Sequence, residues 1–146
     1  MNTVAQDTSK AGASTMVLIV DDDPFSHKLF TAMLANLGIS DVHTAINGRV
    51  GLRTLARMPR PPDVLICDVF MPDMDGIEFL AEVSTIGFRG GIILVSGQDI
   101  SMMDIAQQVA LADGLQVLGA YSKPVPPEIL AESLARLQMP DTSTDM

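Results

Sequence analysis

Short apolar runs alternate with amphipathic segments five times along the chain. The apolar runs are four or five residues long, which suits strands rather than helices. The first, third and fourth runs are nearly continuous aliphatic stretches, as expected for strands that are covered on both faces. We therefore predict strands over Met16–Val20, Val42–Ala45, Val64–Cys67, Ile92–Val95 and Val117–Tyr121.

Each predicted strand is followed by a segment with helix signals. After the first strand, Asp23 is a suitable cap and Pro24 suits the first helical position. Apolar residues then recur every four positions, and Gly38 ends the pattern; they are Phe25, Leu29, Met33 and Leu37.

The other helices have comparable signals. Asp75 and Glu78 have the spacing of a capping box that opens a helix through Ile77, Leu80 and Val83. The remaining helices are predicted over Asn47–Arg57, Ile100–Ala112 and Pro126–Met139. A strict alternation of strand and helix predicts an α/β fold, a three-layer sandwich around a five-stranded parallel sheet.

Composition places these elements in one globular domain. The chain has 146 residues, of which 47% are hydrophobic. Its formal net charge of −9 disfavours direct binding to nucleic acids or to anionic lipid. No apolar run approaches the roughly 18 residues of a membrane helix, so we expect a cytoplasmic protein without a membrane partner. Cys67 lies inside an apolar run and is expected to be a buried, inert thiol.

The two ends of the chain are polar. We predict that residues 1–15 form a disordered N-terminal segment and residues 140–146 a polar tail. The folded domain then covers residues 16–139.

Polar residues follow the predicted strands at their carboxyl ends, where parallel sheets bind ligands. They are Asp21, Asp22 and Asp23 after the first strand, Asp68 after the third, Ser96 and Gly97 after the fourth, and Lys123 with Pro124 after the fifth. One such Asp is readily explained as a helix cap. Two carboxylates about 4 Å apart repel by about 4 kcal/mol at an effective dielectric constant near 20, so the cluster needs a counter-charge. Lys123 is one counter-charge, and we expect a divalent cation to be the other.

The donor set favours magnesium chemistry. Carboxylate oxygens suit Mg²⁺, and no Cys/His spacing for Zn²⁺ is present. His27 and His43 are isolated, and we interpret both as structural or surface residues. A carboxylate beside Mg²⁺, a lysine and a hydroxyl can attack a phosphoryl group and form an acyl phosphate. Asp68 is the best candidate nucleophile because the third strand lies in the middle of the sheet.

At these residues the chain resembles the receiver domains of two-component response regulators. The resemblance covers roughly Met16–Met139, and its most specific part is the D-x-x-M-P-x-M-D-G run with a later K-P pair. The matching segments are Val17–Asp23, Asp68–Gly76, Ile92–Gly97 and Lys123–Pro124. The resemblance implies a flavodoxin-like strand order of 2-1-3-4-5 with five helices.

The resemblance also implies the roles of individual residues. Asp68 would accept phosphate from a histidine kinase or phosphotransfer protein, and Lys123 would pair with a phosphoryl oxygen. Ser96 would be the switch hydroxyl. Mg²⁺ would be held by Asp21, Asp22, Asp68 and the backbone carbonyl of Phe70, which leaves Asp23 as the helix cap.

The resemblance further suggests what sets the lifetime of the phosphorylated state. Phe70 and Gln98 would flank the path of the water that hydrolyses the acyl phosphate. We predict that the apolar Phe70 excludes this water and that Gln98 assists it. The only catalysis expected is of the protein's own phosphorylation and slow dephosphorylation.

Two features depart from the receiver pattern. The position of the usual switch aromatic is Ala120, and strand alternation places Tyr121 on the opposite face, so the usual switching mechanism is in doubt. Lys123 follows Ser96 by 27 positions, which suggests an extended fourth helix or exit loop. This region is similar to receivers linked to cyclic-dinucleotide phosphodiesterase domains. The chain is therefore expected to act alone on a downstream protein or to have lost an output domain.

Other functions are compatible with some of the same residues. A receiver that docks to partners independently of phosphorylation is one alternative, favoured only by the missing aromatic. A haloacid-dehalogenase-type phosphatase would use Asp21–Asp23, but it needs further acids after Lys123 and does not explain the Asp68–Gly76 run. A dinucleotide-binding fold is disfavoured because no G-x-G-x-x-G follows the first strand.

Overall fold

A computed structural model describes residues 15–72, 74–97 and 100–137. Strands and helices alternate along this part of the chain. The strands are β1 (Met16–Val20), β2 (Asp41–Ala45), β3 (Val64–Asp68), β4 (Gly91–Ser96) and β5 (Gln116–Ser122). The helices are α2 (Pro24–Asn36), α3 (Gly48–Arg57), α4 (Gly76–Thr85), α5 (Ile100–Ala112) and α6 (Pro127–Ala135).

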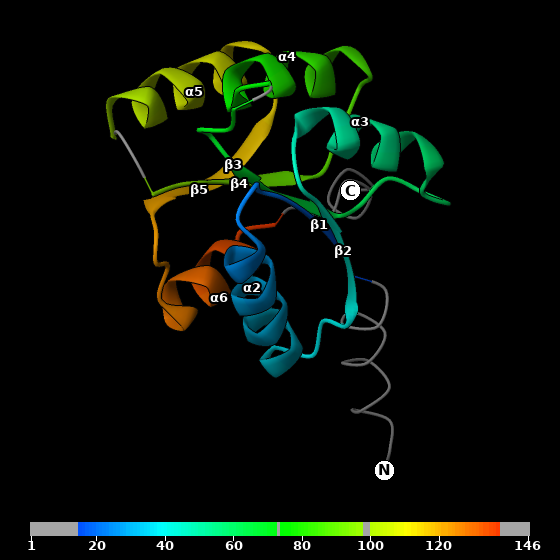
Figure 1. The fold of residues 1–146 in the computed structure, drawn as a ribbon, viewed down its shortest axis with the longest axis vertical. Helices are drawn as coiled ribbons and strands as arrows, with labels where there is room; N and C mark the ends of the chain where they lie inside the picture. The colour runs from blue at the N-terminus through cyan, green and yellow to red at the C-terminus, as the bar shows by residue number, and fades with distance from the viewer. Residues whose placement is uncertain (1–14, 73, 98–99, 138–146) are drawn as a thin grey trace, which may run out of the picture.

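The five strands form one parallel sheet in the order β2-β1-β3-β4-β5 (Figure 1). The predicted strand order is confirmed. Every residue of β1, β3 and β4 is buried, which explains why these strands are continuous apolar runs. Strands β2 and β5 form the two edges of the sheet and are only partly buried.

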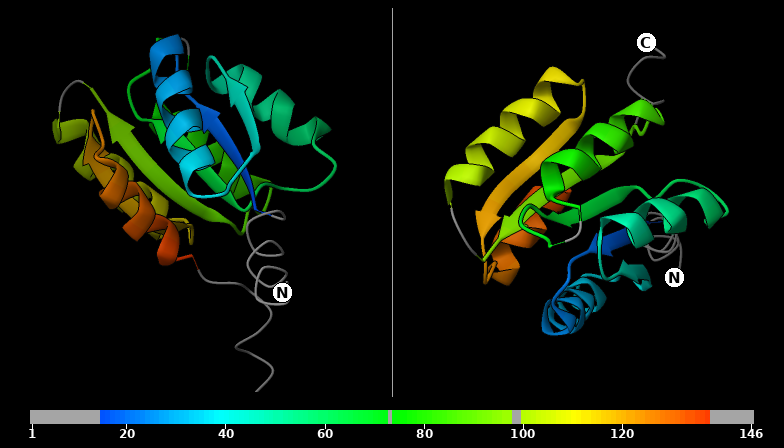
Figure 2. Two further views of the ribbon diagram at one scale, coloured as in Figure 1. Left: turned by 90° about the horizontal axis from the view of Figure 1, so that it is seen from below. Right: turned by 45° about the horizontal axis from the view of Figure 1, so that its top comes forward.

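The helices cover both faces of the sheet, so the predicted three-layer arrangement is confirmed. Helices α3, α4 and α5 lie on one face, and α2 and α6 lie on the other (Figures 1 and 2). Each interface contains its own apolar cluster. Alternate residues of β1 point to opposite clusters. Leu18 belongs to the cluster beneath α3, α4 and α5, and Ile19 belongs to the cluster beneath α2 and α6.

Local signals set the helix starts. The side chains of Asp23, Asn47 and Asp75 accept hydrogen bonds from backbone N–H groups in the first turns of α2, α3 and α4. A Cβ atom at Gly76 would lie 2.6 Å from the Cα atom of Val69, so glycine is needed there. This close approach brings the start of α4 against the backbone that follows Asp68.

The four-residue apolar pattern predicts helix α2 correctly, with Asp23 as its N-cap, but only part of the pattern lies on the buried face. The two ends of the stripe are exposed, Phe25 by 68% and Leu37 by 43%, whereas Phe30 and Leu34 are buried. Residues four apart are rotated by about 40° around a helix of 3.6 residues per turn. A strict four-residue row therefore winds away from the sheet at both ends, and only Met33 of the predicted row is buried.

The last helix is shorter than the predicted Pro126–Met139. Helix α6 begins at Pro127, with Pro126 as its N-cap, and ends at Ala135. The backbone N–H of Arg136 donates to the carbonyl of Ser133, so the last turn tightens and the helix stops. Residues 1–14 of the predicted N-terminal segment 1–15, the whole predicted tail 140–146 and Gln98 lie outside the described residues.

Candidate functional site

The parallel sheet brings the ends of its strands to one edge. Asp21 directly follows β1, Asp68 ends β3, Ser96 ends β4, and Lys123 comes one residue after β5. Strands β1, β3 and β4 are neighbours, so Asp68 lies between the other ends. The backbone N–H of Lys123 donates to the carbonyl of Ser96 at 2.8 Å, which ties the loop after β5 to this edge.

Asp21 is completely buried. Its Oδ1 atom accepts a hydrogen bond from the backbone N–H of Asp23 at 2.9 Å, and its Oδ2 atom accepts one from Lys123 Nζ at 2.8 Å. Both carboxylate oxygens therefore have partners, which is what a buried charge requires.

Asp68 is the most perturbed carboxyl group of the site. Its Oδ1 atom accepts from the backbone N–H of Phe70 at 3.0 Å, and its Oδ2 atom lies 3.3 Å from Lys123 Nζ. Burial, with the charge of Asp21 in addition, raises the pKa of Asp68 from 3.8 to about 6, although Phe70 and Lys123 oppose the shift. In the metal-free protein this carboxylate is thus ionised at neutral pH but titrates close to it.

Lys123 is the counter-charge to both buried carboxylates. Burial lowers the pKa of Lys123, but hydrogen bonding to Asp21 and the charges of Asp68 and Asp21 outweigh burial and raise the pKa overall. The ammonium group also donates to the hydroxyl of Ser26 at 3.2 Å. Lys123 is therefore held as a cation between the ends of β1 and β3.

Three carboxylates form a set of possible metal ligands. One oxygen each from Asp21, Asp22 and Asp68 lies within 4.8 Å of the other two. Oxygen-only donors with one exposed member, Asp22, suit Mg²⁺, which keeps several waters in its coordination sphere. The donor set therefore fits magnesium. The backbone carbonyl of Phe70 stays a predicted ligand.

The carboxylates open into a cleft of about 450 Å³. Its lining includes Asp22, Asp68, Phe70, Gly97 and Lys123. Phe70 is 48% exposed at this opening and lies two residues after Asp68 in the chain. Ser96 is buried at the end of β4, and Gln98 falls outside the described residues.

Two residues of the site were not predicted from the sequence. Ser26, buried on the first turn of α2, accepts from Lys123 and donates to Asp23 Oδ2 at 3.4 Å. His27 donates from Nε2 to the backbone carbonyl of Asp21 at 2.6 Å, so its role is to position the strand end. The capping signal at Asp23 could have suggested this contact region, because it places the first turn of α2 beside the acids.

Strand β5, which leads to Lys123, has no aromatic side chain on the face of the sheet that α3, α4 and α5 cover. Ala120 packs against the cluster beneath α3, α4 and α5, whereas Tyr121 packs against the opposite cluster. This confirms the predicted separation of the two side chains. The Tyr121 hydroxyl is hydrogen-bonded to Ser133 and accepts from Arg136 at 3.1 Å, so the ring is anchored to α6.

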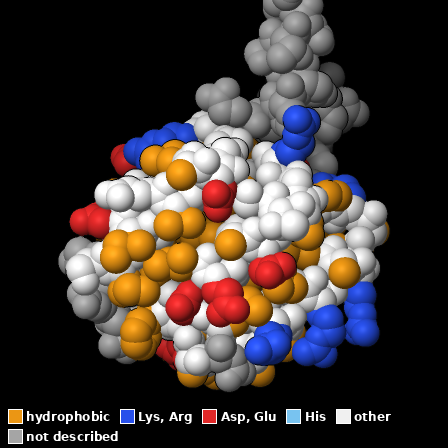
Figure 3. All heavy atoms as spheres, turned by 90° about the horizontal axis from the view of Figure 1, so that it is seen from above, with side chains coloured by type: hydrophobic (Ala, Val, Ile, Leu, Met, Phe, Trp, Pro, Cys, Tyr) orange, Lys and Arg blue, Asp and Glu red, His pale blue; other side chains and the backbone are white. Residues whose placement is uncertain are grey.

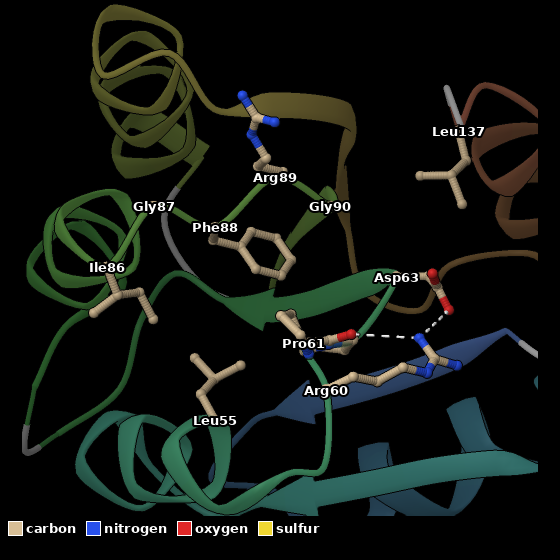
Figure 4. A pocket seen from close by; sticks show the side chains of 11 residues that line it. Leu55, Arg60, Pro61, Asp63, Ile86, Gly87, Phe88, Arg89, Gly90 and Leu137 are labelled. Carbon is tan, nitrogen blue, oxygen red and sulfur yellow. Dashed lines mark hydrogen bonds and ion pairs between the residues drawn. The ribbon is translucent and has the colours of Figure 1, made fainter. Parts of the chain in front are cut away.

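A second cavity lies at the other end of the strands, where β3 and β4 begin. It has a volume of about 370 Å³, and its walls come from the loops that precede β3 and β4 (Figure 4). Arg60 in this wall donates to Asp63 at 3.2 Å. The cavity shares no lining residue with the acidic cleft and is separate from the site.

Comparison with known proteins identifies the family of this chain. The sequence profile of the response regulator receiver domain matches residues 17–135. This match covers most of the chain and includes all four strand ends described above. The chain belongs to the response regulator receiver domain family.

Curated relatives are larger proteins. A protein-glutamate methylesterase/protein-glutamine glutaminase of Nocardioides sp. is 40% identical over 81 residues, which are 55% of this chain and 22% of that protein. The sensor histidine kinase RcsC of Salmonella typhimurium is 28% identical over 128 residues, 88% of this chain and 13% of that protein. The chain thus spans less than a quarter of the length of these two relatives.

Solved structures show the same architecture. The chemotaxis protein CheY4 of Vibrio cholerae has a TM-score of 0.68 and 29% identity, over 85% of this chain and 98% of that one. A receiver domain protein of Clostridium thermocellum has a TM-score of 0.71 and 24% identity, over 83% of this chain and 91% of that one. Among the described residues, no helix is long and apolar enough to cross a membrane.

Proposed function

We propose that this chain is the phosphoacceptor of a two-component or phosphorelay pathway and that Asp68 takes a phosphoryl group from a phosphohistidine. The observation that carries the proposal is the position of Lys123 between two carboxylates. Its Nζ atom lies 3.3 Å from Asp68 Oδ2 and 2.8 Å from Asp21 Oδ2. Receiver domains interact with histidine kinases and phosphotransfer proteins, and a kinase is among the relatives. The family is generally non-enzymatic, so turnover of an external substrate is not expected.

The reaction is a displacement at phosphorus. A carboxylate oxygen of Asp68 attacks the phosphorus atom, the P–N bond to the donor imidazole breaks, and its electron pair returns to the imidazole nitrogen. Attack requires the ionised carboxylate, which the metal-free protein provides above about pH 6. The backbone N–H of Phe70 orients the carboxylate by its bond to Oδ1, which leaves Oδ2 beside Lys123.

Charge on the transferred group is balanced by the residues around it. Lys123 is already held at the carboxylate and pairs with a phosphoryl oxygen, while the hydroxyl of Ser96 is the proposed second donor. Asp21, Asp22 and Asp68 would hold Mg²⁺, together with the backbone carbonyl of Phe70. When bound, the ion supplies further positive charge to the phosphoryl oxygens.

The proposed donor surface is an apolar hollow beside the cleft. This hollow has a volume of about 310 Å³ and is lined by Phe25 and Leu29 of α2 and by Pro124 and Val125 after Lys123. Phe25 is exposed by 68% although it is a large aromatic side chain. A protein donor that brings its histidine to Asp68 must contact the rim of the cleft. An exposed aromatic side chain that the partner buries on binding is a typical anchor for such a contact.

Replacing this aromatic separates protein donors from small donors. Phe25→Asp is expected to slow phosphorylation by a phosphohistidine-bearing domain about tenfold or more, because an anchor residue contributes at least about 1.4 kcal/mol to docking. Phosphorylation by acetyl phosphate should be unchanged. The matched control is Leu37→Asp, which places the same charge at the far end of α2. Equal slowing by both variants would contradict a donor surface at Phe25.

The lifetime of the phosphorylated state is proposed to depend on Phe70. Its ring is half-exposed at the cleft and excludes the water that must approach the phosphorus in line with Asp68. Phe70→Asn is expected to accelerate dephosphorylation by about tenfold, which is less than the roughly hundredfold or more of a fully positioned general base, because an asparagine amide can orient the water but does not take its proton. Decay is followed by intact mass after the donor is removed, with Phe25→Asn as the control aromatic. A slower or unchanged decay in Phe70→Asn would show that another residue controls the lifetime.

Gln98→Ala should slow the decay modestly, because the glutamine amide is proposed to assist the attacking water.

The direct test of the proposal is phosphoryl uptake. With acetyl phosphate and Mg²⁺, the wild-type chain should gain one phosphoryl group, and Asp68→Asn should gain none. Asp104→Asn, at an exposed position of α5, is the matched control and should behave as wild type. Full uptake by Asp68→Asn would reject the nucleophile, and no uptake by the wild type would favour a docking role that is independent of phosphorylation.

A further inference from the structure

The helical face formed by α3, α4 and α5 carries two rows of opposite charge. On α3, Arg49, Arg53 and Arg57 follow one another at four-residue intervals, and all three are exposed. On α4, Glu78 and Glu82 are exposed at the same interval. In Figure 3, basic side chains gather along the margin of this face over α3, and acidic side chains lie toward its middle. We call these the arginine row and the glutamate row.

The two rows are not paired within one molecule. Among the described residues, no ion pair or hydrogen bond involves the charged group of any member of either row. Helix α3 contains no acidic residue and α4 contains no basic residue, so neither helix neutralises its own row. Like charges four residues apart repel, and Arg49 also lies at the positive end of its helix dipole. Arg57 in the last turn of α3 and Glu78 in the first turn of α4 are favourably placed for their helix dipoles, but no ion pair within the described part of one copy offsets the repulsion along either row.

We propose that the arginine row and the glutamate row form a symmetric dimer interface, with α3 of one copy packed against α4 of a second copy. The two helices are each ten residues long, lie in contact, and both follow strands of a parallel sheet. A two-fold axis that runs between them in the plane of this face places each row opposite the other row. The same contact then forms twice, as an isologous dimer requires.

Charge complementarity favours a second copy over other anionic partners. The chain has a net charge of −9, which repels nucleic acids, anionic membranes and a second copy alike at long range, so the preference for a second copy comes from the local pattern of charge on this face. A second copy presents carboxylates at the spacing of the arginine row on this same face. Guanidinium groups also pair with carboxylates in a bidentate geometry. No member of either row lines the acidic cleft, so the dimer and the phosphoacceptor function can fail independently.

Self-association is measured by sedimentation equilibrium on the unphosphorylated full chain. We expect a weak dimer at low ionic strength, with a dissociation constant that rises at least about tenfold between 0.1 M and 1 M NaCl, because the screening length falls from about 10 Å to about 3 Å. A wild-type chain that stays monomeric up to about millimolar concentration in 0.1 M NaCl would overturn the proposal. A dimer that is indifferent to salt would overturn it as well.

Charge reversal tests the reciprocal arrangement. One variant combines Arg49→Glu with Arg53→Glu, and a second combines Glu78→Arg with Glu82→Arg. Each variant alone should be monomeric, because like rows then face each other, and an equimolar mixture should recover a heterodimer of near wild-type affinity. Lys28→Glu and Glu132→Arg, which lie on the opposite layer, are the control pair and should leave the dimer intact.

Each outcome of the mixing experiment decides the proposal. Thermal denaturation first confirms that each variant is folded, and uptake from acetyl phosphate confirms that the acidic cleft is unaffected. Recovery of the heterodimer supports a two-fold contact between the rows. Dimers that survive either reversal place the interface elsewhere, and variants that fail to recombine exclude the reciprocal contact.

Discussion

Lys123→Ala is expected to lower the free energy of unfolding by about 2–3 kcal/mol when Mg²⁺ is absent. Removing one partner of a buried ion pair costs about 3–5 kcal/mol, and the 17% exposure of the Lys123 side chain reduces that figure. The loss is large because one ammonium compensates two buried carboxylates, Asp21 and Asp68. Urea denaturation in the presence of a chelator measures the difference from the wild type.

Two comparisons make this prediction specific. Lys28→Ala, an exposed lysine on α2, should change stability by less than about 0.5 kcal/mol. Saturating Mg²⁺ should reduce the effect of Lys123→Ala, because a second source of positive charge then compensates the same carboxylates. If Lys123→Ala and Lys28→Ala are equally stable without metal, Lys123 is not the counter-charge of the site.

Magnesium itself should stabilise the wild-type protein by about 2.7 kcal/mol at a free concentration one hundred times its dissociation constant. The physical reason is that the carboxylates of Asp21, Asp22 and Asp68 repel one another in the folded state and are dispersed in the unfolded state. The measurement is the midpoint of thermal or urea denaturation as a function of Mg²⁺ at constant ionic strength.

Asp22→Ala should remove most of this stabilisation. Asp22 is the exposed member of the donor set, so its loss changes metal binding while the buried contacts of Asp21 and Asp68 stay in place. Asp104→Ala serves as the control, because it removes an exposed carboxylate that lies outside the site. A midpoint that does not move with Mg²⁺ in the wild type would show that these carboxylates do not form a metal site.

The fold could be predicted from the sequence because its signals are local and repeated. Strand β1 is one continuous aliphatic run, and Asp75 forms the expected capping bond with the backbone N–H of Glu78 at 2.8 Å. The errors arise where tertiary contacts decide. The turn of the helix determines that Phe30 rather than Phe25 is buried on α2, and the hydrogen bond from Arg136 to Leu118 accompanies the early end of α6.

Only the site residues at the ends of strands could be predicted from the sequence. Asp21, Asp68 and Lys123 each follow or end a recognisable strand, so the topology alone brings them together. Ser26 and His27 approach from a helix, and their contacts depend on how the first turn of α2 is rotated. Sequence spacing does not specify that rotation, so it gives no signal for Ser26 and indicates for His27 only a structural or surface position, not its contact with Asp21.

The position of Tyr121 could be predicted from the sequence, but its hydrogen bonds could not. Alternation along β5 places Ala120 and Tyr121 on opposite faces, as expected from the sequence. The anchoring of the tyrosine hydroxyl by Ser133 and Arg136 depends on the position of α6 and has no local signal. Position 120 therefore has no aromatic side chain, and the ring at position 121 is held on the opposite face of the sheet.

Locating the phosphoryl group is the most direct test of the central claim. The wild-type chain is phosphorylated with acetyl phosphate and Mg²⁺, the acyl phosphate is reduced with borohydride to homoserine, and the modified residue is identified by peptide mass mapping. We expect homoserine at position 68 alone, since that carboxylate has its Oδ1 atom oriented by Phe70 and its Oδ2 atom beside Lys123. Homoserine at position 21, 22 or 23 with an intact Asp68 would contradict this claim.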